Sequence, residues 1–532
     1  MAQSRFLVAL LLTLPLAALV GFRQGAAEYQ RNLTDSSTRS SVRPPAARIR
    51  GQGRARPAVL PVNSVQMQNA PEPLASEMIP AERLAAYGNL AVQWMQEYLR
   101  IDTTNPPGNE IRAAEFFKRI FDREGIQCRL FQYASGRADI WARVPATVRV
   151  SDGATGRERP IILLNHMDVV TSDPSHWQAP PFSGSIVADT MYGRGSQDMK
   201  GEAIAQLLVM VMLKREHPPI NRDVIFLATA DEEAKDTGTD WFIAHRRDLL
   251  GNAEFLITEG GQNVFQDGQV RSVGVDVAEK APFWLHLVAR GQPGHGSIPI
   301  ADSAVNRLLR ALRRINAYHP APKVLPSVDQ FFRAMAAIEP PARARQFLNF
   351  RAALQDTRFR ESVEQDDSLS YMLHNTISIT MLGGSKQINV IPDEAWANLD
   401  VRLLPGEDPR KFLETLRAIV ADPNVTIEPL DGFVSANSSP TDTLLFAAIR
   451  RVAEHYFAGA PVLPRLTSGY TESQRYRSLG MVCYGFTPYT ATPAEADTEH
   501  GDNERIRLQE LRRGYRVLYD VVLQVAGASS GT

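Results

Sequence analysis

Short apolar runs alternate with helical patterns in the first half of the chain, and this alternation limits the possible folds more than any other feature. The apolar runs typical of buried strands lie at 161–164, 224–228 and 255–257, and the helical spacing lies at 202–214 and 239–248. This order predicts an α/β fold with a mostly parallel sheet and helices on both faces. Ligands of such sheets bind at the carboxyl ends of the strands.

The pattern changes after residue 283. Strand-like runs come closer together, at 376–381, 395–403 and 425–429, with a helix expected at 409–420. Grouped strands with helices on one side predict a small α+β domain inserted into the first one. Because 532 residues are too many for one core, we expect a main domain over 78–283 and 431–528 and an inserted domain over 284–430.

The N-terminus carries a targeting pattern. Arg5 precedes an apolar run over 6–22, and small residues follow it. Residues 1–27 are therefore expected to be a signal peptide or, in the competing interpretation, a membrane anchor. Residues 28–77 are rich in Arg, Ser, Pro and Gly without apolar periodicity, which predicts a disordered linker. The expected location is secreted or periplasmic, alternatively membrane-anchored.

Charge and cysteine content exclude some classes of protein. The formal net charge is -1, and no basic run suggests a nucleic-acid partner. Cys128 and Cys483 are the two cysteines of the chain. Two distant cysteines build neither a disulfide scaffold nor a cysteine zinc site, so any metal must be held by His, Asp and Glu.

Acidic and histidine residues follow the expected strands. The clusters contain His166 and Asp168, then Asp198, Glu232, Glu233 and Glu259, and far along the chain His500. Singly each has a plain explanation, such as a helix cap for Asp198 or a solvated loop for the acidic pair. Together they form the ligand set that a two-metal hydrolytic site needs. Zinc accepts imidazole with carboxylate, whereas calcium and magnesium prefer oxygen ligands.

Several motifs resemble metallopeptidase family M20, and the resemblance covers about residues 80–525. They are Asn165-His166-Met167-Asp168, Tyr192-Gly193-Arg194-Gly195 with Asp198 and Lys200, Asp231-Glu232-Glu233, Glu259-Gly260-Gly261, Gly294-His295-Gly296-Ser297, Asn389-Val390-Ile391-Pro392, Asp400-Val401-Arg402 and His500-Gly501. The family includes aminoacylase, carnosinase, glutamate carboxypeptidase and succinyl-diaminopimelate desuccinylase. The chain is most similar to its secreted N-acyl-amino-acid hydrolases and yeast vacuolar carboxypeptidase.

The resemblance implies a role for each site residue. The implied metal ligands are His166, Asp198, Glu233, Glu259 and His500, with Asp198 bridging two Zn2+ ions that Co2+ or Mn2+ can replace. Glu232 would be the general base on a metal-bridging water, and Asp168 would orient His166. From the inserted lid domain, His295 would steady the scissile carbonyl, while Arg402 and Asn389 would bind the substrate carboxylate. One departure is Tyr470 with Glu472, where the family has a Gly-Gly-Thr-Asp segment.

The implied activity is cleavage of an amide or peptide bond next to a free carboxylate, by a carboxypeptidase or an N-acyl-amino-acid hydrolase. The partner would be a small peptide or N-acyl amino acid. A dipeptidase of the same family is the alternative, and a non-catalytic peptide-binding protein on this fold is a third. The resemblance also suggests a homodimer formed through the lid, with monomeric relatives as the other precedent.

Overall fold

The computed structural model describes residues 73–148, 158–430, 432 and 435–528. The expected signal peptide or anchor at 1–27 and most of the expected linker lie outside these residues. Within the described part, the helices are too short or too polar to cross a membrane.

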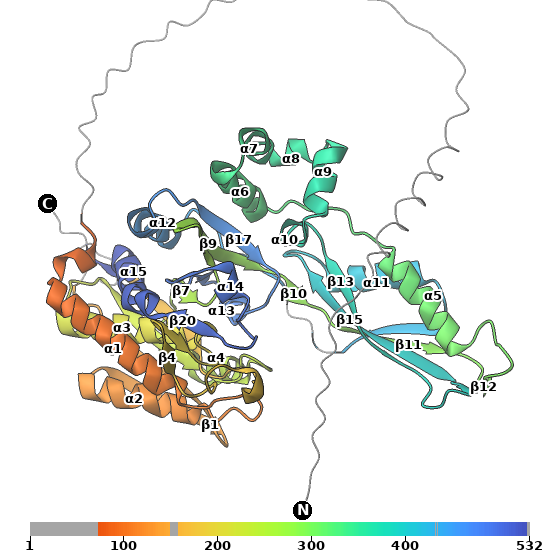
Figure 1. The fold of residues 1–532 in the computed structure, drawn as a ribbon, viewed down its shortest axis with the longest axis horizontal. Coiled ribbons are helices and arrows are strands. Elements are labelled where there is room, and N and C mark those ends of the chain that lie inside the picture. Colours follow the sequence, from red (N-terminus) through yellow and green to blue (C-terminus); the bar gives the residue numbers. More distant parts are fainter. Residues whose placement is uncertain (1–72, 149–157, 431, 433–434, 529–532) are drawn as a thin grey trace, which may run out of the picture. The chain divides into compact units, whose positions relative to one another are not determined.

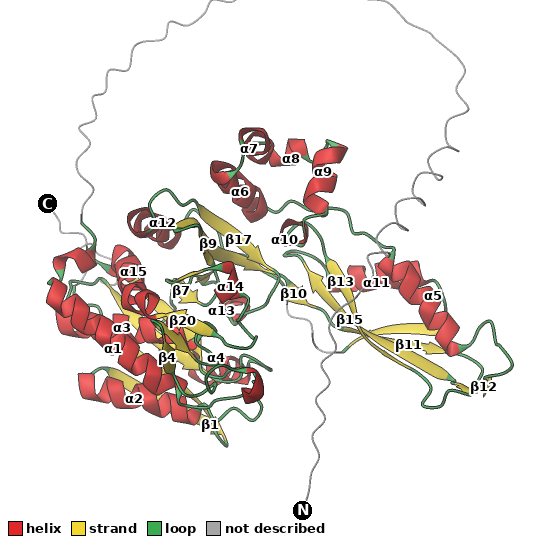
Figure 2. Ribbon diagram, in the orientation of Figure 1, coloured by secondary structure: helices red, strands yellow, loops and turns green. Residues whose placement is uncertain are grey.

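The centre of the fold is a mixed, mostly parallel sheet. Its middle strands β6 (Arg222–Thr229), β3 (Glu158–His166) and β7 (Phe255–Thr258) are parallel and match three of the predicted apolar runs. The central residues of these strands are buried, which is why each strand contains a continuous apolar run. The confirmed fold class is therefore α/β, as Figure 2 shows.

Seven further strands complete this sheet in the described residues. Across the sheet the order is β1 (Gln127–Ala134), β2 (Arg137–Val144), β6, β3, β7, β18 (Val482–Gly485), β9 (Gln269–Glu279), β8 (Asn263–Gln266) and β19 (Thr490–Ala491), with β17 (Val462–Thr467) also paired to β9. Strand β18 continues the parallel set beside β7. The hairpin β1–β2 adds an antiparallel edge to β6.

Helices cover both faces because successive residues of a strand point to opposite sides. On β3, Ile161 and Leu163 pack into a core cluster with α1 (Ala81–Leu99), α2 (Ile111–Glu124), α3 (Lys200–Glu216), α12 (Leu444–Tyr456) and α15 (Leu508–Ala526). Ile162 and Leu164 pack into another with α4 (Thr237–Arg246) and α13 (Ser473–Ser478). In Figure 1, elements that are far apart in the sequence lie side by side in these layers.

The folded part begins before the residue predicted from composition. A 3-10 helix spans Ala75–Met78, so the last residues of the expected linker fold. Ser76 is buried, and its amide and hydroxyl donate hydrogen bonds of 2.7 and 2.6 Å to the carboxylate of Asp520 in α15. This partner lies 444 residues away, so local composition carries no sign of it.

A five-stranded sheet forms from the middle of the chain. It contains β10 (Ala281–Pro282), β11 (Leu285–Arg290), β13 (Thr376–Gly383), β15 (Glu394–Leu403) and β16 (Val425–Pro429). Alternate residues of β15 are buried, and they share a separate core cluster with α5 (Ala304–Asn316) and α11 (Pro409–Val420). Its core is thus distinct from the core of the larger sheet.

A helical segment interrupts this second region. It contains α6 (Pro326–Met335), α7 (Pro341–Leu348), α8 (Phe350–Ala353), α9 (Thr357–Glu364) and α10 (Asp367–Ser370). Phe332 stacks on Phe350 with ring centroids 3.6 Å apart. Both rings belong to the core cluster of the larger sheet, although they fall inside the range 284–430 expected for the inserted domain.

Candidate active site and metal centre

Four of the proposed site residues lie at the carboxyl ends of the parallel strands. His166 is the last residue of β3, Glu232 and Glu233 follow β6, and Glu259 follows β7 directly. Because these strands are parallel and adjacent, their carboxyl ends share one edge of the sheet. The strand order therefore gathers residues separated by almost a hundred positions.

His166 stands at the centre of the first group. Its ring is buried, and Nε2 lies 2.9 Å from Oδ1 of Asp198 and 3.1 Å from Oε2 of Glu259. On the other side of the ring, Nδ1 lies 3.0 Å from the backbone carbonyl oxygen of Asp168. The ring thus keeps one nitrogen for the backbone and directs the other at two carboxylates, which fits a metal ligand with a fixed tautomer.

His500 forms the second group with the same aspartate. Its Nε2 lies 2.9 Å from Oδ2 of Asp198 and 3.3 Å from Oε2 of Glu233. Asp198 therefore lies between two histidines and directs one carboxylate oxygen at each. This is the arrangement required of a residue that bridges two metal ions.

The ligand atoms are close enough to hold metal ions. His166, Asp198 and Glu233 offer atoms within 4.8 Å of one another, and so do His166, Glu232 and Glu259. Oε1 of Glu233 is buried and has no hydrogen-bond partner among the described residues. An orphaned buried carboxylate oxygen beside imidazoles is available as a metal ligand, and this donor set suits zinc.

Burial and crowding act strongly on these groups. Burial, and then the charge of Glu259, raise the pKa of Glu232 well above its ordinary value. The hydrogen bonds with Asp198 and Glu233 raise the pKa of His500 to about 11. Burial alone would raise the pKa of Asp198, but hydrogen bonds from the two histidines hold it below its usual range. So many carboxylates in one buried place are stable only when cations or protons neutralise them.

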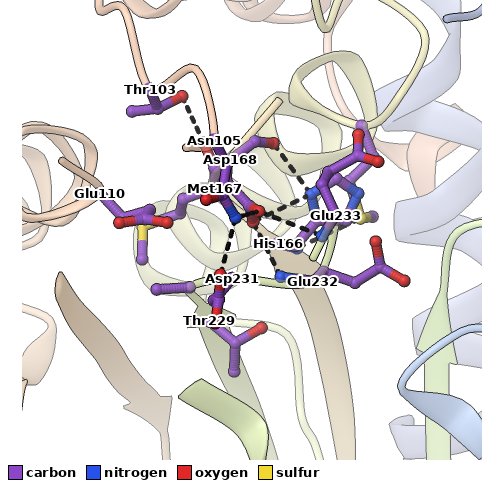
Figure 3. Close-up of polar contacts among 12 residues, drawn as sticks. Thr103, Asn105, Glu110, His166, Met167, Asp168, Thr229, Asp231, Glu232 and Glu233 are labelled. Atoms are coloured by element: carbon purple, nitrogen blue, oxygen red, sulfur yellow. Dashed lines mark hydrogen bonds and ion pairs between the residues drawn. The ribbon is translucent and has the colours of Figure 1, made fainter. Parts of the chain in front are cut away.

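Asp168 holds the acidic loop with its carboxylate and contacts the His166 ring with its backbone carbonyl. As Figure 3 shows, its carboxylate receives hydrogen bonds from the backbone N–H groups of Glu232 and Glu233, each 3.1 Å long, and from Nδ2 of Asn105 at 2.7 Å. Its Oδ1 is 3.7 Å from Nδ1 of His166. The backbone of Asp168, not its carboxylate, is thus the nearer partner of the ring, because the carboxylate is engaged by three N–H donors.

Glu504 holds the turn that carries Asp198, a role that the sequence did not reveal. Its buried carboxylate accepts 2.7 Å hydrogen bonds from the amides of Gly195 and Gln197 and from Nη1 of Arg194. The feature of the sequence that could have pointed to Glu504 is its position four residues after His500. Asn105 was missed too, because nothing in a turn before two prolines marks it as a partner of Asp168.

A cavity of about 1050 Å³ opens at the candidate metal centre. Glu232, Glu233, Glu259 and His500 line it, and Arg402 of β15 lines it too. The segment that departs from the family pattern also takes part: Tyr470 lines the cavity. Glu472, by contrast, is buried and accepts a 2.6 Å hydrogen bond from the hydroxyl of Thr229.

His295 and Asn389 lie apart from this cavity. His295 is exposed in β12 (Gly294–His295), which pairs with β14 (Val390–Ile391), and its Nδ1 lies 2.7 Å from Oγ of Ser297. Neither His295 nor Asn389 is among the described residues that line the cavity. A single chain therefore brings together the expected ligands, the expected base and Arg402, but not these two residues.

Comparison with known proteins agrees with this site. Residues 162–524 match Peptidase family M20/M25/M40. An N-fatty-acyl-amino acid synthase/hydrolase PM20D1 of Xenopus tropicalis is 28% identical over 65% of this chain and 69% of its own length, and aminoacylase-1A of Rattus norvegicus is 24% identical over 82% and 95%. An M20 family metallo-carboxypeptidase of Sulfolobus solfataricus has the same fold, with a TM-score of 0.58 at 17% identity over 81% of this chain and 98% of that one. The chain therefore belongs to Peptidase family M20/M25/M40, and it is a hydrolytic enzyme.

Proposed function

We propose that the protein is a hydrolase with two zinc ions that cleaves an amide or peptide bond next to a free carboxylate, as a carboxypeptidase or an N-acyl-amino-acid hydrolase. The observation that carries this proposal is the position of Asp198 between His166 and His500, with one oxygen 2.9 Å from each imidazole. Names of relatives support the reaction class, since they include an N-fatty-acyl-amino acid synthase/hydrolase and an aminoacylase.

His166, Asp198 and Glu259 would hold the first ion, and Asp198, Glu233 and His500 the second. When bound, the ions polarise the scissile carbonyl and offset the charge that develops on its oxygen. Co2+ or Mn2+ can take their place.

Glu232 is the proposed general base. Its carboxylate takes a proton from the attacking water and delivers it to the nitrogen of the leaving amine as the C–N bond breaks. The hydrogen bond from its amide to Asp168 fixes the backbone, while its side chain lines the cavity.

Arg402 is the proposed ligand of the substrate carboxylate. Its guanidinium is paired with Asp400 on the same strand, through contacts of 2.8 and 3.1 Å that fix its orientation. A guanidinium held in this way still has free N–H groups that can bind a carboxylate in the cavity.

A homodimer would supply the missing residues. We propose that His295 and Asn389 of a second copy reach the cavity and bind the scissile carbonyl and the substrate carboxylate. The strand β13 supports pairing through the inserted region, because β15 is its one partner among the described strands. Its exposed Ile379, Met381 and Leu382 form an apolar surface at that edge.

The first test is hydrolysis of a panel of N-acyl amino acids and dipeptides by the purified protein, with and without a chelator. Cleavage that the chelator abolishes and zinc restores would support the proposal. The class of substrate cleaved would separate an N-acyl-amino-acid hydrolase from a dipeptidase. A fully metal-loaded protein that cleaves no substrate of the panel would argue against it.

Export through residues 1–27 is a separate proposal, which rests on the apolar run after Arg5.

A further inference from the structure

Lys280 lies at the junction between the two sheets. It is the residue between β9 of the larger sheet and β10 of the five-stranded sheet, and it is 0% exposed. Its backbone N–H donates a 3.2 Å hydrogen bond to the carbonyl oxygen of Thr467, a residue that lines the cavity. The backbone of Lys280 is therefore fixed to the wall of the cavity.

The ammonium group of Lys280 holds the segment that leads into β13. Its Nζ donates hydrogen bonds to the backbone oxygens of Tyr371 and His374, at 3.2 and 2.9 Å, and to Oγ1 of Thr376 at 2.9 Å. Thr376 is the first residue of β13. An ammonium group has three N–H donors, so these three oxygens satisfy it. One side chain at the junction between β9 and β10 thus fixes the start of β13.

Arg402 lies between the two strands that Lys280 connects. Its strand, β15, pairs with both β10 and β13 (Figure 1), and Arg402 is opposite Pro282 of β10 and Thr376 of β13. Residues directly opposite one another project from the same face of a sheet, so Arg402 and Thr376 share a face. Lys280 therefore joins both neighbours of Arg402, through the backbone that leads to Pro282 and through the hydroxyl of Thr376.

The charge of Arg402 also acts on Lys280. Burial, and then the guanidinium of Arg402, lower the pKa of Lys280 to about 7, while the carboxylate of Asp400 acts in the opposite direction. The hydrogen-bond partners of the ammonium group are themselves uncharged. A buried ammonium group is costly in such surroundings, and an anion that binds at Arg402 reduces this cost. These two cations and one carboxylate are therefore suited to an anionic ligand.

We propose that Lys280 is a positioning residue for substrate binding: by fastening the strands on both sides of Arg402, it holds the guanidinium where it meets the substrate carboxylate. This inference rests on the proposed function, in which Arg402 is the ligand of that carboxylate. Lys280 is not among the described residues that line the cavity, so it acts through Arg402 and not by touching the substrate.

The steady-state constants of Lys280→Met distinguish this role from a structural one. For the panel substrate that the protein cleaves best, KM should rise about tenfold, as the weakening of a hydrogen bond to a charged group implies. The value of kcat should not change, because Glu232 and the proposed metal ligands are untouched. Lys323→Met is the matched control. Lys323 contacts the same segment through a 2.7 Å hydrogen bond from its N–H to the carbonyl oxygen of Leu373, but its ammonium group is exposed and pairs with Glu407. Its KM should equal that of the unmodified protein.

A double mutant tests whether Lys280 acts through Arg402. Arg402→Met alone should raise KM, and adding Lys280→Met should raise it no further, because residues that act through one contact are not additive. Three results would each overturn the inference alone: an unchanged KM in Lys280→Met, a loss of kcat at unchanged KM, or a further tenfold rise of KM in the double mutant.

Thr376→Val provides a test that does not depend on the folding of Lys280→Met. It keeps the ammonium group and removes one of its three acceptors. We expect KM to rise about threefold at unchanged kcat, in line with the loss of one hydrogen bond. An unchanged KM in this variant would also overturn the inference alone. If the unmodified, metal-loaded protein cleaves no substrate of the panel, the proposed function is overturned and this inference with it.

Discussion

Oδ2 of Asp198 lies 2.9 Å from Nε2 of His500, although 302 residues separate them in sequence. The other oxygen of Asp198 faces His166, so one carboxylate joins two halves of the site. Removing either histidine should therefore affect the metals differently from removing the aspartate.

Metal content tests this geometry. His500→Ala should retain about one ion per chain, because the first position keeps His166 and Glu259, whereas Asp198→Ala should lose most of both. Elemental analysis of purified protein measures this directly. His176→Ala is the control, since this exposed histidine contacts Asp502, near His500 in sequence. Two ions retained in His500→Ala would contradict the ligand assignment.

The role of Glu232 can be separated from metal binding. Glu232→Gln should lower kcat by about 10²–10⁴-fold while the metal content stays at the level of the unmodified protein, because a general base moves protons and holds no ion. Both quantities are measured on the same preparation. Since Glu232 also lies within reach of His166 and Glu259, a loss of metal in this variant would make it a ligand instead.

The buried pair of Arg194 and Glu504 should matter for stability. Glu504→Ala leaves the Arg194 guanidinium buried without its partner, so we expect about 3–5 kcal/mol lower free energy of unfolding. The exposed pair of Arg290 and Glu394 gives the control, and Glu394→Ala should cost about 1 kcal/mol or less. Denaturant titration of the two variants compares them, and equal losses would refute the assigned role.

Glu110 should make stability depend on pH. Burial, and then the charge of Asp168, raise its pKa from 4.5 to about 7, despite the pairing with Arg137. Between pH 4.5 and 7 the folded chain keeps a proton that the unfolded chain loses, so this group's contribution to stability falls as pH rises through that window. Glu110→Gln should remove this slope from the pH profile of unfolding, and an unchanged slope would contradict the shift.

The sequence predicted the elements whose burial is complete. Strands β3, β6 and β7 are covered on both faces, so each contains an uninterrupted apolar run. Their order placed His166, the acidic pair and Glu259 at one edge. The hairpin β1–β2 was missed because several residues of β1 are exposed, and the polar residues Arg129 and Gln132 divide its apolar residues into short pieces.

Contacts between distant residues could not be predicted. No local pattern relates Ser76 to Asp520 or Glu504 to Gly195, since each pair forms only after the sheet and its helices pack. The position of His295 was also beyond a single sequence. Its motif has the family's spacing, but spacing along a chain does not say which copy of the chain receives the side chain.

His500 follows every strand of the larger sheet in sequence order. On the proposed ligand assignment, a growing chain that already contains His166, Asp198 and Glu259 has the ligands of the first ion. It does not yet have all the ligands of the second ion. The two-ion site is therefore completed only when the segment that carries His500 has been made, so the larger sheet is fully synthesised before the protein can hold both ions.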